Sequence, residues 1–164
     1  MTAATENRTT QMYRVFISAT PEAIWDALTN PEWTQRYGYR GILDCDDLSP
    51  GSPYRFKATE EFQQMGMPEV VVEGEVVEAD PPRKLVHTWS FNWDEIRHEG
   101  PTRVTFQIDD GPGGVSKLTV THELENAPLT ASQLAGEVEG AGGGWAFVLS
   151  DLKTLLETGS VLPG

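Results

Sequence analysis

The sequence has 164 residues, with 12 basic and 25 acidic side chains and a formal net charge of −13. Such a surface repels phosphate backbones and anionic membranes, which argues against nucleic-acid and lipid-surface binding. Cys45 is the single cysteine and cannot form an internal disulfide, which favours a reducing compartment. Residues 1–10 lack the apolar core of a secretory signal, and no segment has the length and apolarity of a membrane span. We therefore expect a cytoplasmic protein with a flexible tail over residues 1–10 and one domain over residues 11–164.

The first elements are a strand and two short helices. Apolar residues alternate with other residues over 13–17, which predicts a strand. At residues 20–22, Thr-Pro-Glu combines a capping hydroxyl, a proline suited to the first turn and an acid near the positive end of the helix dipole. Asn-Pro-Glu at residues 30–32 ends this helix and starts a second short one. The sequence therefore predicts two short helices directly after the first strand.

The middle of the chain is predicted to be a meander of strands, since turn residues separate segments in which apolar positions alternate. Gly74 is expected at a bulge or a close backbone approach. Residues 62–69 and 94–101 are expected to be loops, and 109–114 a hairpin turn. A long connection over 126–144 is expected to hold one short helix near 133–138. The predicted strands are 41–47, 54–58, 70–79, 85–91, 104–108 and 118–124.

The last long segment, residues 142–158, is predicted to be a helix with one apolar stripe. The polar face is expected to include Ser150, Asp151, Lys153, Thr154 and Glu157. A stripe of this size needs a wide apolar partner, and the rest of the chain is mostly strands. We therefore predict an α+β fold in which a curved antiparallel sheet wraps around a long C-terminal helix, an arrangement that often encloses a cavity. The stripe consists of Trp145, Val148, Leu149, Leu152, Leu155 and Leu156.

Six segments carry a resemblance to a known family: ATPEAIWDALTNPEWTQRY, GSPYRF, GEVVEADPPRKLVHTW, TRVTF, KLTVTHE and GGGWAFVLSDLKTLLETG. They resemble the bacterial homologues of the activator of heat-shock protein 90 ATPase, within the START, birch-pollen-allergen and polyketide-cyclase superfamily. The resemblance covers about residues 12–159 and implies the helix-grip fold. Members of the superfamily include lipid carriers, hormone receptors, cyclases and a cochaperone, so the resemblance implies a fold more firmly than an activity.

A cavity between sheet and helix would have an aromatic wall. His87 and His122 lie on the predicted inner faces of their strands, where each is either a polar anchor for a ligand or a structural histidine bonded to a neighbouring strand. The aromatic residues, in turn, either line a cavity or form plain core. The candidate ligand-binding residues are Trp33, Tyr37, Phe56, His87, Trp89, Phe106, His122, Trp145 and Leu149.

Motifs for metal binding and for nucleophilic catalysis are absent from the sequence. His87, His98, His122 and Cys45 show no paired-ligand spacing, so we expect no metal site. No Gly-x-Ser-x-Gly motif is present. The glycine run at 140–144 has no strand before it and no lysine after it, which argues against phosphate binding. We accordingly expect no cofactor and assign no catalytic residue.

Three functions are compatible with the sequence. The first is a protein, monomeric or homodimeric, that holds a small apolar or amphipathic molecule between the sheet and the C-terminal helix. The second is a cochaperone-like protein that stimulates a heat-shock chaperone ATPase through an exposed acidic or apolar surface, as the resemblance implies. The third is a cyclase or hydrolase, which needs a carboxylate within hydrogen-bond reach of one of the cavity histidines. The position of the exposed apolar area separates the first from the second.

Overall fold

The computed structural model describes residues 10–138 and 143–163. The first half of the chain forms β1 (Thr10–Ile17), α2 (Pro21–Thr29), α3 (Pro31–Thr34), β2 (Ile42–Asp44), β3 (Arg55–Lys57), α4 (Glu60–Gln64), β4 (Val70–Glu73) and β5 (Val76–Asp80). The second half forms β6 (Lys84–Phe91), η1 (Arg97–Glu99), β7 (Thr102–Asp110), η2 (Pro112–Gly114), β8 (Ser116–Glu123), α5 (Pro128–Leu134) and α6 (Gly144–Thr158). The predicted flexible tail and part of the glycine run lie outside the described residues.

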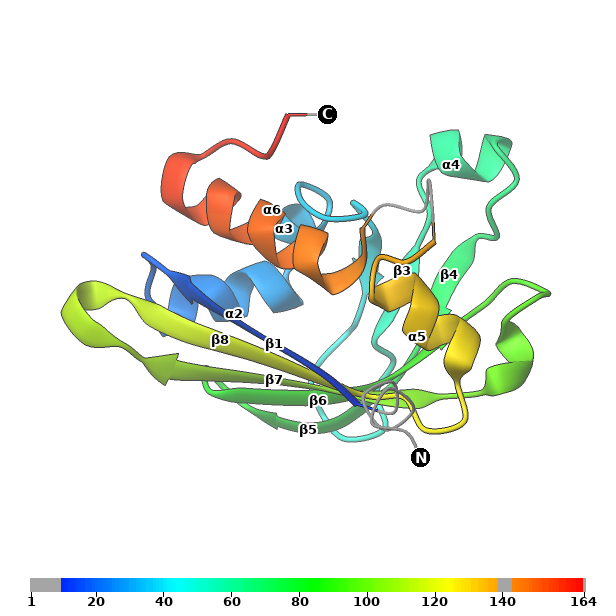
Figure 1. Ribbon diagram of the computed structural model, residues 1–164, viewed down its shortest axis with the longest axis horizontal. Coiled ribbons are helices and arrows are strands. Elements are labelled where there is room, and N and C mark those ends of the chain that lie inside the picture. Colours follow the sequence, from blue (N-terminus) through cyan, green and yellow to red (C-terminus); the bar gives the residue numbers. More distant parts are fainter. Residues whose placement is uncertain (1–9, 139–142, 164) are drawn as a thin grey trace.

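The strands form one antiparallel sheet in the order β1-β8-β7-β6-β4-β3-β2, and β5 also pairs with β6. Figure 1 shows α6 running across one face of this sheet, with α2 on the same side and β3 and β4 rising beside the helix. This is the curved sheet around a C-terminal helix that the sequence predicts, with α2 and α3 following β1. The helix-grip architecture is therefore confirmed, and the core lies between the sheet and α6. No helix in the described ranges is long and apolar enough to cross a membrane.

Helix α6 buries most of the predicted stripe, but its polar face differs from the prediction at one residue. Leu152 is fully buried, and Val148 and Leu156 lie half-buried at the flanks. Asp151 was expected on the solvent side, yet it is only 2% exposed. Its carboxylate accepts hydrogen bonds from the backbone N–H groups of Gly38 and Leu162, both at 2.8 Å. These donors replace the water that a buried carboxylate loses, which explains how the charge is accommodated.

The predicted strand 70–79 is two strands, which corrects the sequence interpretation. β4 and β5 pair in succession with β6, and the break lies at Gly74 and Glu75. The expectation of a close backbone approach at Gly74 is confirmed, because a Cβ there would collide with the carbonyl oxygens of Thr88 and Tyr54. Alternation along one segment cannot reveal that the ladder is interrupted, since both halves keep a period of two.

Two helices also differ from the prediction. Residues 60–64, partly within an expected loop, form α4, and the Thr59 hydroxyl accepts a hydrogen bond from the N–H of Phe62 at 3.3 Å. Helix α5 begins five residues before the expected 133, at Pro128, without a capping side chain of its own. The carboxylate of Glu99 instead accepts hydrogen bonds from the N–H groups of Leu129 and Thr130, each at 2.8 Å. This cap comes from a distant part of the chain, so local sequence gives no sign of it.

Candidate functional site

A cavity of about 810 Å³ lies between the inner face of the sheet, α6 and the segment around α4. β3, β4, β6 and β7 supply one side of its wall, and α6 supplies the other. Protein interiors normally pack without voids much larger than a water molecule. A space of this size in a chain of 164 residues is therefore a distinct feature of the fold.

Most of the sequence-predicted ligand-binding residues line this cavity. Trp33 and His122 do not: Trp33 lies half-buried on α3 with the guanidinium of Arg36 over its ring at 4.7 Å, and His122 lies behind Trp145. Whether the wall residues bind a ligand stays a prediction. Those on the wall are Tyr37, Phe56, His87, Trp89, Phe106, Trp145 and Leu149.

Sequence reasoning missed several interior residues of the wall, Tyr54 among them, and the rim. Tyr54 lines the cavity, is 2% exposed and stacks on the ring of His87 at 4.1 Å between centroids. Tyr54 lies two residues before Phe56, and residues two apart on a strand point to the same face. This spacing is the signal in the sequence that could have identified Tyr54 as a wall residue. Phe62, Met65 and Met67 also line the cavity while remaining exposed, Met65 by 73%. They mark where the cavity reaches the surface, beside α4.

His122 is held in a hydrogen-bonded chain that uses both ring nitrogens. The indole N–H of Trp145 donates to Nδ1 at 3.1 Å, and Nε2 lies 2.6 Å from the Thr102 hydroxyl. That hydroxyl donates to the carbonyl of Trp89 at 2.8 Å. An indole N–H can only donate, so Nδ1 of His122 is the acceptor and Nε2 carries the proton. His122 is therefore a neutral structural histidine that joins β6, β7, β8 and α6.

Burial is the main reason that the pKa of His122 is lowered from 6.5 to about 3, and the neighbouring His87 contributes further. The charged imidazolium would lose its hydration and would have to give up the bond from Trp145. The ring therefore stays neutral at physiological pH, as its hydrogen bonds require.

His87 has one nitrogen bonded and the other without a partner. Its ring lies between Tyr54 and Phe106, whose centroid is 5.7 Å away. Nδ1 lies 2.9 Å from the carbonyl oxygen of Thr88, which can only accept, so Nδ1 carries the proton. Burial lowers the pKa of His87 from 6.5 to about 4, although the bond to Thr88 acts in the opposite direction. Nε2 is consequently a buried acceptor.

Two buried side-chain atoms of wall residues lack a hydrogen-bond partner among the described residues: Nε2 of His87 and the indole Nε1 of Trp89. One can only accept and the other can only donate. Leaving a buried polar group unpaired costs about 1–3 kcal/mol. The two atoms therefore form an unsatisfied acceptor and donor on one face of β6.

The charged side chains of the cavity wall lie where the wall is exposed to solvent. Arg40 and Glu95 are exposed, and the Lys57 ammonium lies 3.8 Å from the carboxylate of Asp44. Glu95 is the one carboxylate among the described wall residues. No carboxylate in the described ranges hydrogen-bonds to His87 or His122. The described residues also hold no cluster of His, Cys, Asp and Glu suited to a metal ion.

The family model described as "Activator of Hsp90 ATPase homolog 1-like protein" matches residues 18–157. The chain belongs to this family. The resemblance stated from the sequence is thereby confirmed. The search of curated proteins finds no match.

Solved structures share the fold at low sequence identity. The chain is similar to the Aha1 dimer from Colwellia psychrerythraea, with 19% identity, 92% of this chain and 97% of that chain covered, and a TM-score of 0.58. It is also similar to PFC0360w, an HSP90 activator from Plasmodium falciparum, with 21% identity, coverage of 93% and 90%, and a TM-score of 0.55. For crystalline CalU16 from Micromonospora echinospora, identity is 18%, the TM-score is 0.52, and the match covers 69% of this chain but 59% of that one.

Proposed function

We propose that the protein binds a small, mainly apolar or amphipathic molecule in the cavity between the sheet and α6. The observation that carries this proposal is the cavity itself, at about 810 Å³. Small-molecule sites in proteins commonly have volumes of about 300–1,000 Å³ and apolar walls with few polar groups. The cavity falls within this class in both size and composition.

The distribution of polarity supports an amphipathic orientation. Aromatic and aliphatic side chains such as Phe106, Trp145 and Leu149 surround the interior. The charged wall residues Arg40 and Glu95 are exposed to solvent. A bound molecule would place its apolar body inside and a polar end towards these charges, since burying a charge without a partner is costly.

The arrangement of the two histidines favours a ligand-binding protein over a cyclase or hydrolase. General acid–base catalysis needs a titrating group that is free to exchange a proton near the operating pH. Both nitrogens of His122 are already bonded, and His87 has no carboxylate partner in the described residues. Neither histidine therefore has the arrangement of a general base.

The experiment is to purify the protein from its own source and analyse it by native mass spectrometry for a retained small molecule. In parallel, the purified protein is titrated with an apolar naphthalene-based fluorescent probe. We expect one probe per folded chain and a rise in melting temperature, because a ligand that binds only the native state stabilises it. The absence of both a retained molecule and probe binding contradicts the proposal.

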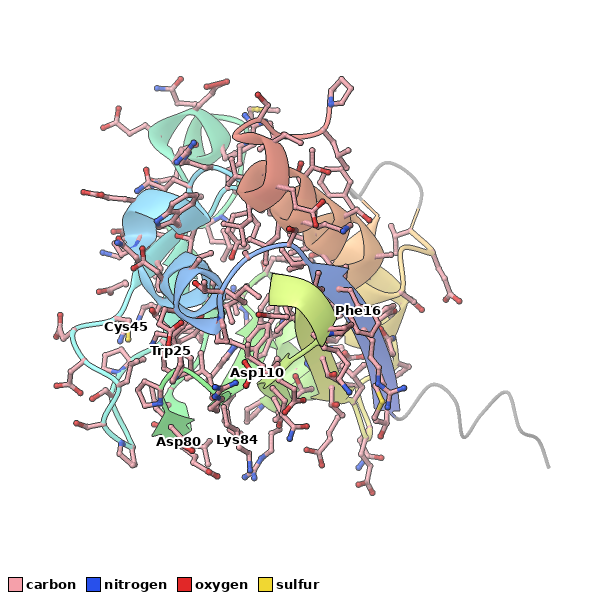
Figure 2. All side chains as sticks on the ribbon, turned by 90° about the vertical axis from the view of Figure 1, so that its left-hand side faces the viewer. Phe16, Trp25, Cys45, Asp80, Lys84 and Asp110 are labelled. Carbon is pink, nitrogen blue, oxygen red and sulfur yellow. The ribbon has the colours of Figure 1, made fainter. Side chains whose placement is uncertain are left out.

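A second candidate function is cochaperone-like docking. It is favoured by the family match and by apolar side chains outside the cavity: Met12 and Phe16 on the outer face of β1 are 54% and 53% exposed. Figure 2 labels Phe16 on this strand. The test is the ATPase rate of the source organism's heat-shock protein 90 with the native protein and with Phe16→Glu. Stimulation that Phe16→Glu abolishes supports docking, and no effect of either protein contradicts it.

A further inference from the structure

We infer that the molecule held in the cavity carries a neutral hydroxyl group that donates a hydrogen bond to Nε2 of His87 and accepts one from Nε1 of Trp89. This inference rests on the proposed function and specifies the chemistry of its ligand. The two atoms are the wall's unsatisfied acceptor and donor among the described residues.

The hydrogen-bonding role of each atom is set by its surroundings. Because Nδ1–H of His87 donates a hydrogen bond to the carbonyl oxygen of Thr88, Nε2 presents a lone pair. Burial between the rings of Tyr54 and Phe106 disfavours the charged imidazolium, so Nε2 stays an acceptor at neutral pH. The indole nitrogen of Trp89 is a donor at every accessible pH.

The two side chains lie two residues apart on the inner face of β6, and their ring centroids are separated by 6.2 Å. A hydroxyl oxygen that donates one hydrogen bond and accepts another, each of about 2.9 Å, has near-tetrahedral geometry, so the two nitrogens would lie roughly 4.7 Å apart. A hydroxyl is the smallest group that both donates and accepts. One hydroxyl therefore matches the pair in its hydrogen-bonding role.

Charged ligand groups fit this position poorly. A carboxylate cannot donate to Nε2 of His87, and an ammonium cannot accept from the indole of Trp89. The charges that would neutralise them, on Arg40, Lys57 and Glu95, belong to side chains with substantial solvent exposure, unlike buried His87 and Trp89. The surrounding rings of Tyr54 and Phe106 favour an aromatic body. The inferred class is accordingly an alcohol or phenol with a mainly apolar, preferably aromatic, skeleton.

Both polar atoms are fully covered by neighbouring atoms in the structure. The hydroxyl therefore reaches them only when side chains of the wall shift. Rotamer changes of this kind are common when partners bind, even where the backbone moves little.

The test uses three probes of similar shape: 2-naphthol, 2-methoxynaphthalene and naphthalene. The methoxy compound keeps the acceptor oxygen but loses the donor. In isothermal titration at pH 7 we expect 2-naphthol to bind at least about fivefold more tightly than 2-methoxynaphthalene, the effect of one hydrogen bond. In His87→Leu this ratio should fall to about one, and His87→Gln, which retains an acceptor, should restore part of it.

Trp89→Phe provides the complementary measurement, because it removes the donor and keeps an aromatic ring. It should weaken 2-naphthol and 2-methoxynaphthalene about equally and change the affinity for naphthalene least. Nitrogen-15 NMR of the native protein gives a readout that does not depend on the variants folding. On titration with 2-naphthol, Nε2 of His87 and the indole N–H of Trp89 should both shift, whereas naphthalene should not shift Nε2.

The outcomes separate this inference from the proposed function. If naphthalene binds while 2-naphthol binds no more tightly than 2-methoxynaphthalene, the hydroxyl inference is wrong and the apolar-binding proposal stands. A preference that persists unchanged in His87→Leu also overturns the inference. If none of the three probes binds and the native protein retains no small molecule, both proposals fail.

Discussion

The indole N–H of Trp145 donates a hydrogen bond of 3.1 Å to Nδ1 of His122, which ties the start of α6 to β8. The two residues are 23 positions apart, and the bond is buried. Trp145 therefore lines the cavity and also anchors α6, the helix that covers the cavity. Stability and the shape of the site are therefore linked through one side chain.

We predict that Trp145 and His122 are energetically coupled. His122→Leu leaves the indole N–H of Trp145 without an acceptor and the Thr102 hydroxyl oxygen without a donor, at a cost of about 1–3 kcal/mol for each unpaired group. Trp145→Phe removes the unpaired indole donor, so the double variant should lose less than the sum of the single variants. Urea unfolding of all four proteins measures the coupling, which we expect to exceed about 0.5 kcal/mol. Additive losses would mean that the bond contributes nothing to stability.

Stability should fall as the pH is lowered from neutrality. The pKa values of His87 and His122 are lowered to about 4 and about 3 in the folded protein, from 6.5. Below pH 6.5 the unfolded chain binds protons that the folded protein does not, so stability rises with pH in this window. Full stability from these groups is present above pH 6.5 and is lost as the pH falls towards 4 and then 3. The free energy of unfolding then changes by at most about 1.4 kcal/mol per pH unit for each histidine.

The measurement is the urea midpoint between pH 7.5 and 4.5 for the native protein and for His87→Leu. The variant should show a shallower slope, because one of the two linked groups is gone. A stability that does not change between pH 7 and 5 would contradict a neutral, buried state of both histidines.

Asp151→Ala should destabilise the protein more than its position on a predicted polar face suggests. The substitution leaves the N–H groups of Gly38 and Leu162 without their acceptor, at about 1–3 kcal/mol for each group that stays dry. The exposed neighbour Ser150 offers a matched control, and Ser150→Ala should change stability by less than about 0.5 kcal/mol. Equal effects in denaturant unfolding would show that Asp151 behaves as a surface residue.

Leu152→Ala should cost about 2–5 kcal/mol, because Leu152 is fully buried between α6 and the sheet. The half-buried Leu156 on the same helix is the control, and Leu156→Ala should cost clearly less. Chemical denaturation of both variants gives the comparison. A loss below about 0.5 kcal/mol at Leu152 would place it outside the packed core.

The cavity is tested by adding the same bulk at two buried valines. Val72 on β4 lines the cavity, whereas Val120 on β8 is fully buried and lies off its wall. Val72→Trp should keep the fold and abolish binding of the apolar probe, since empty space accepts the ring. Val120→Trp should be destabilised by about 1–3 kcal/mol or more through overpacking. Equal destabilisation of the two, measured by thermal and urea unfolding, would mean that no usable space exists beside Val72.

The sequence by itself determined the elements that repeat locally. The alternation over 13–17 and the three- and four-residue spacing from Trp145 to Leu156 each describe one face of one element. These patterns predicted β1 and α6, and the same alternation predicted the inward faces of β6 and β7, which placed His87, Trp89, Phe106, Trp145 and Leu149 on the cavity wall. A period is a property of neighbouring residues, so it can be read without knowing what the face packs against.

Tertiary structure alone decided the contacts between distant residues. Asp151 is buried because Gly38, 113 positions earlier, supplies a backbone N–H. Helix α5 starts where it does because Glu99 caps it from 31 positions before Thr130. His122 lies off the wall and accepts a hydrogen bond from Trp145, and His87 keeps a free acceptor because no described group bonds to Nε2. Each outcome depends on which donors and acceptors the folded chain brings within hydrogen-bond distance, and periodicity along a segment carries no information about that.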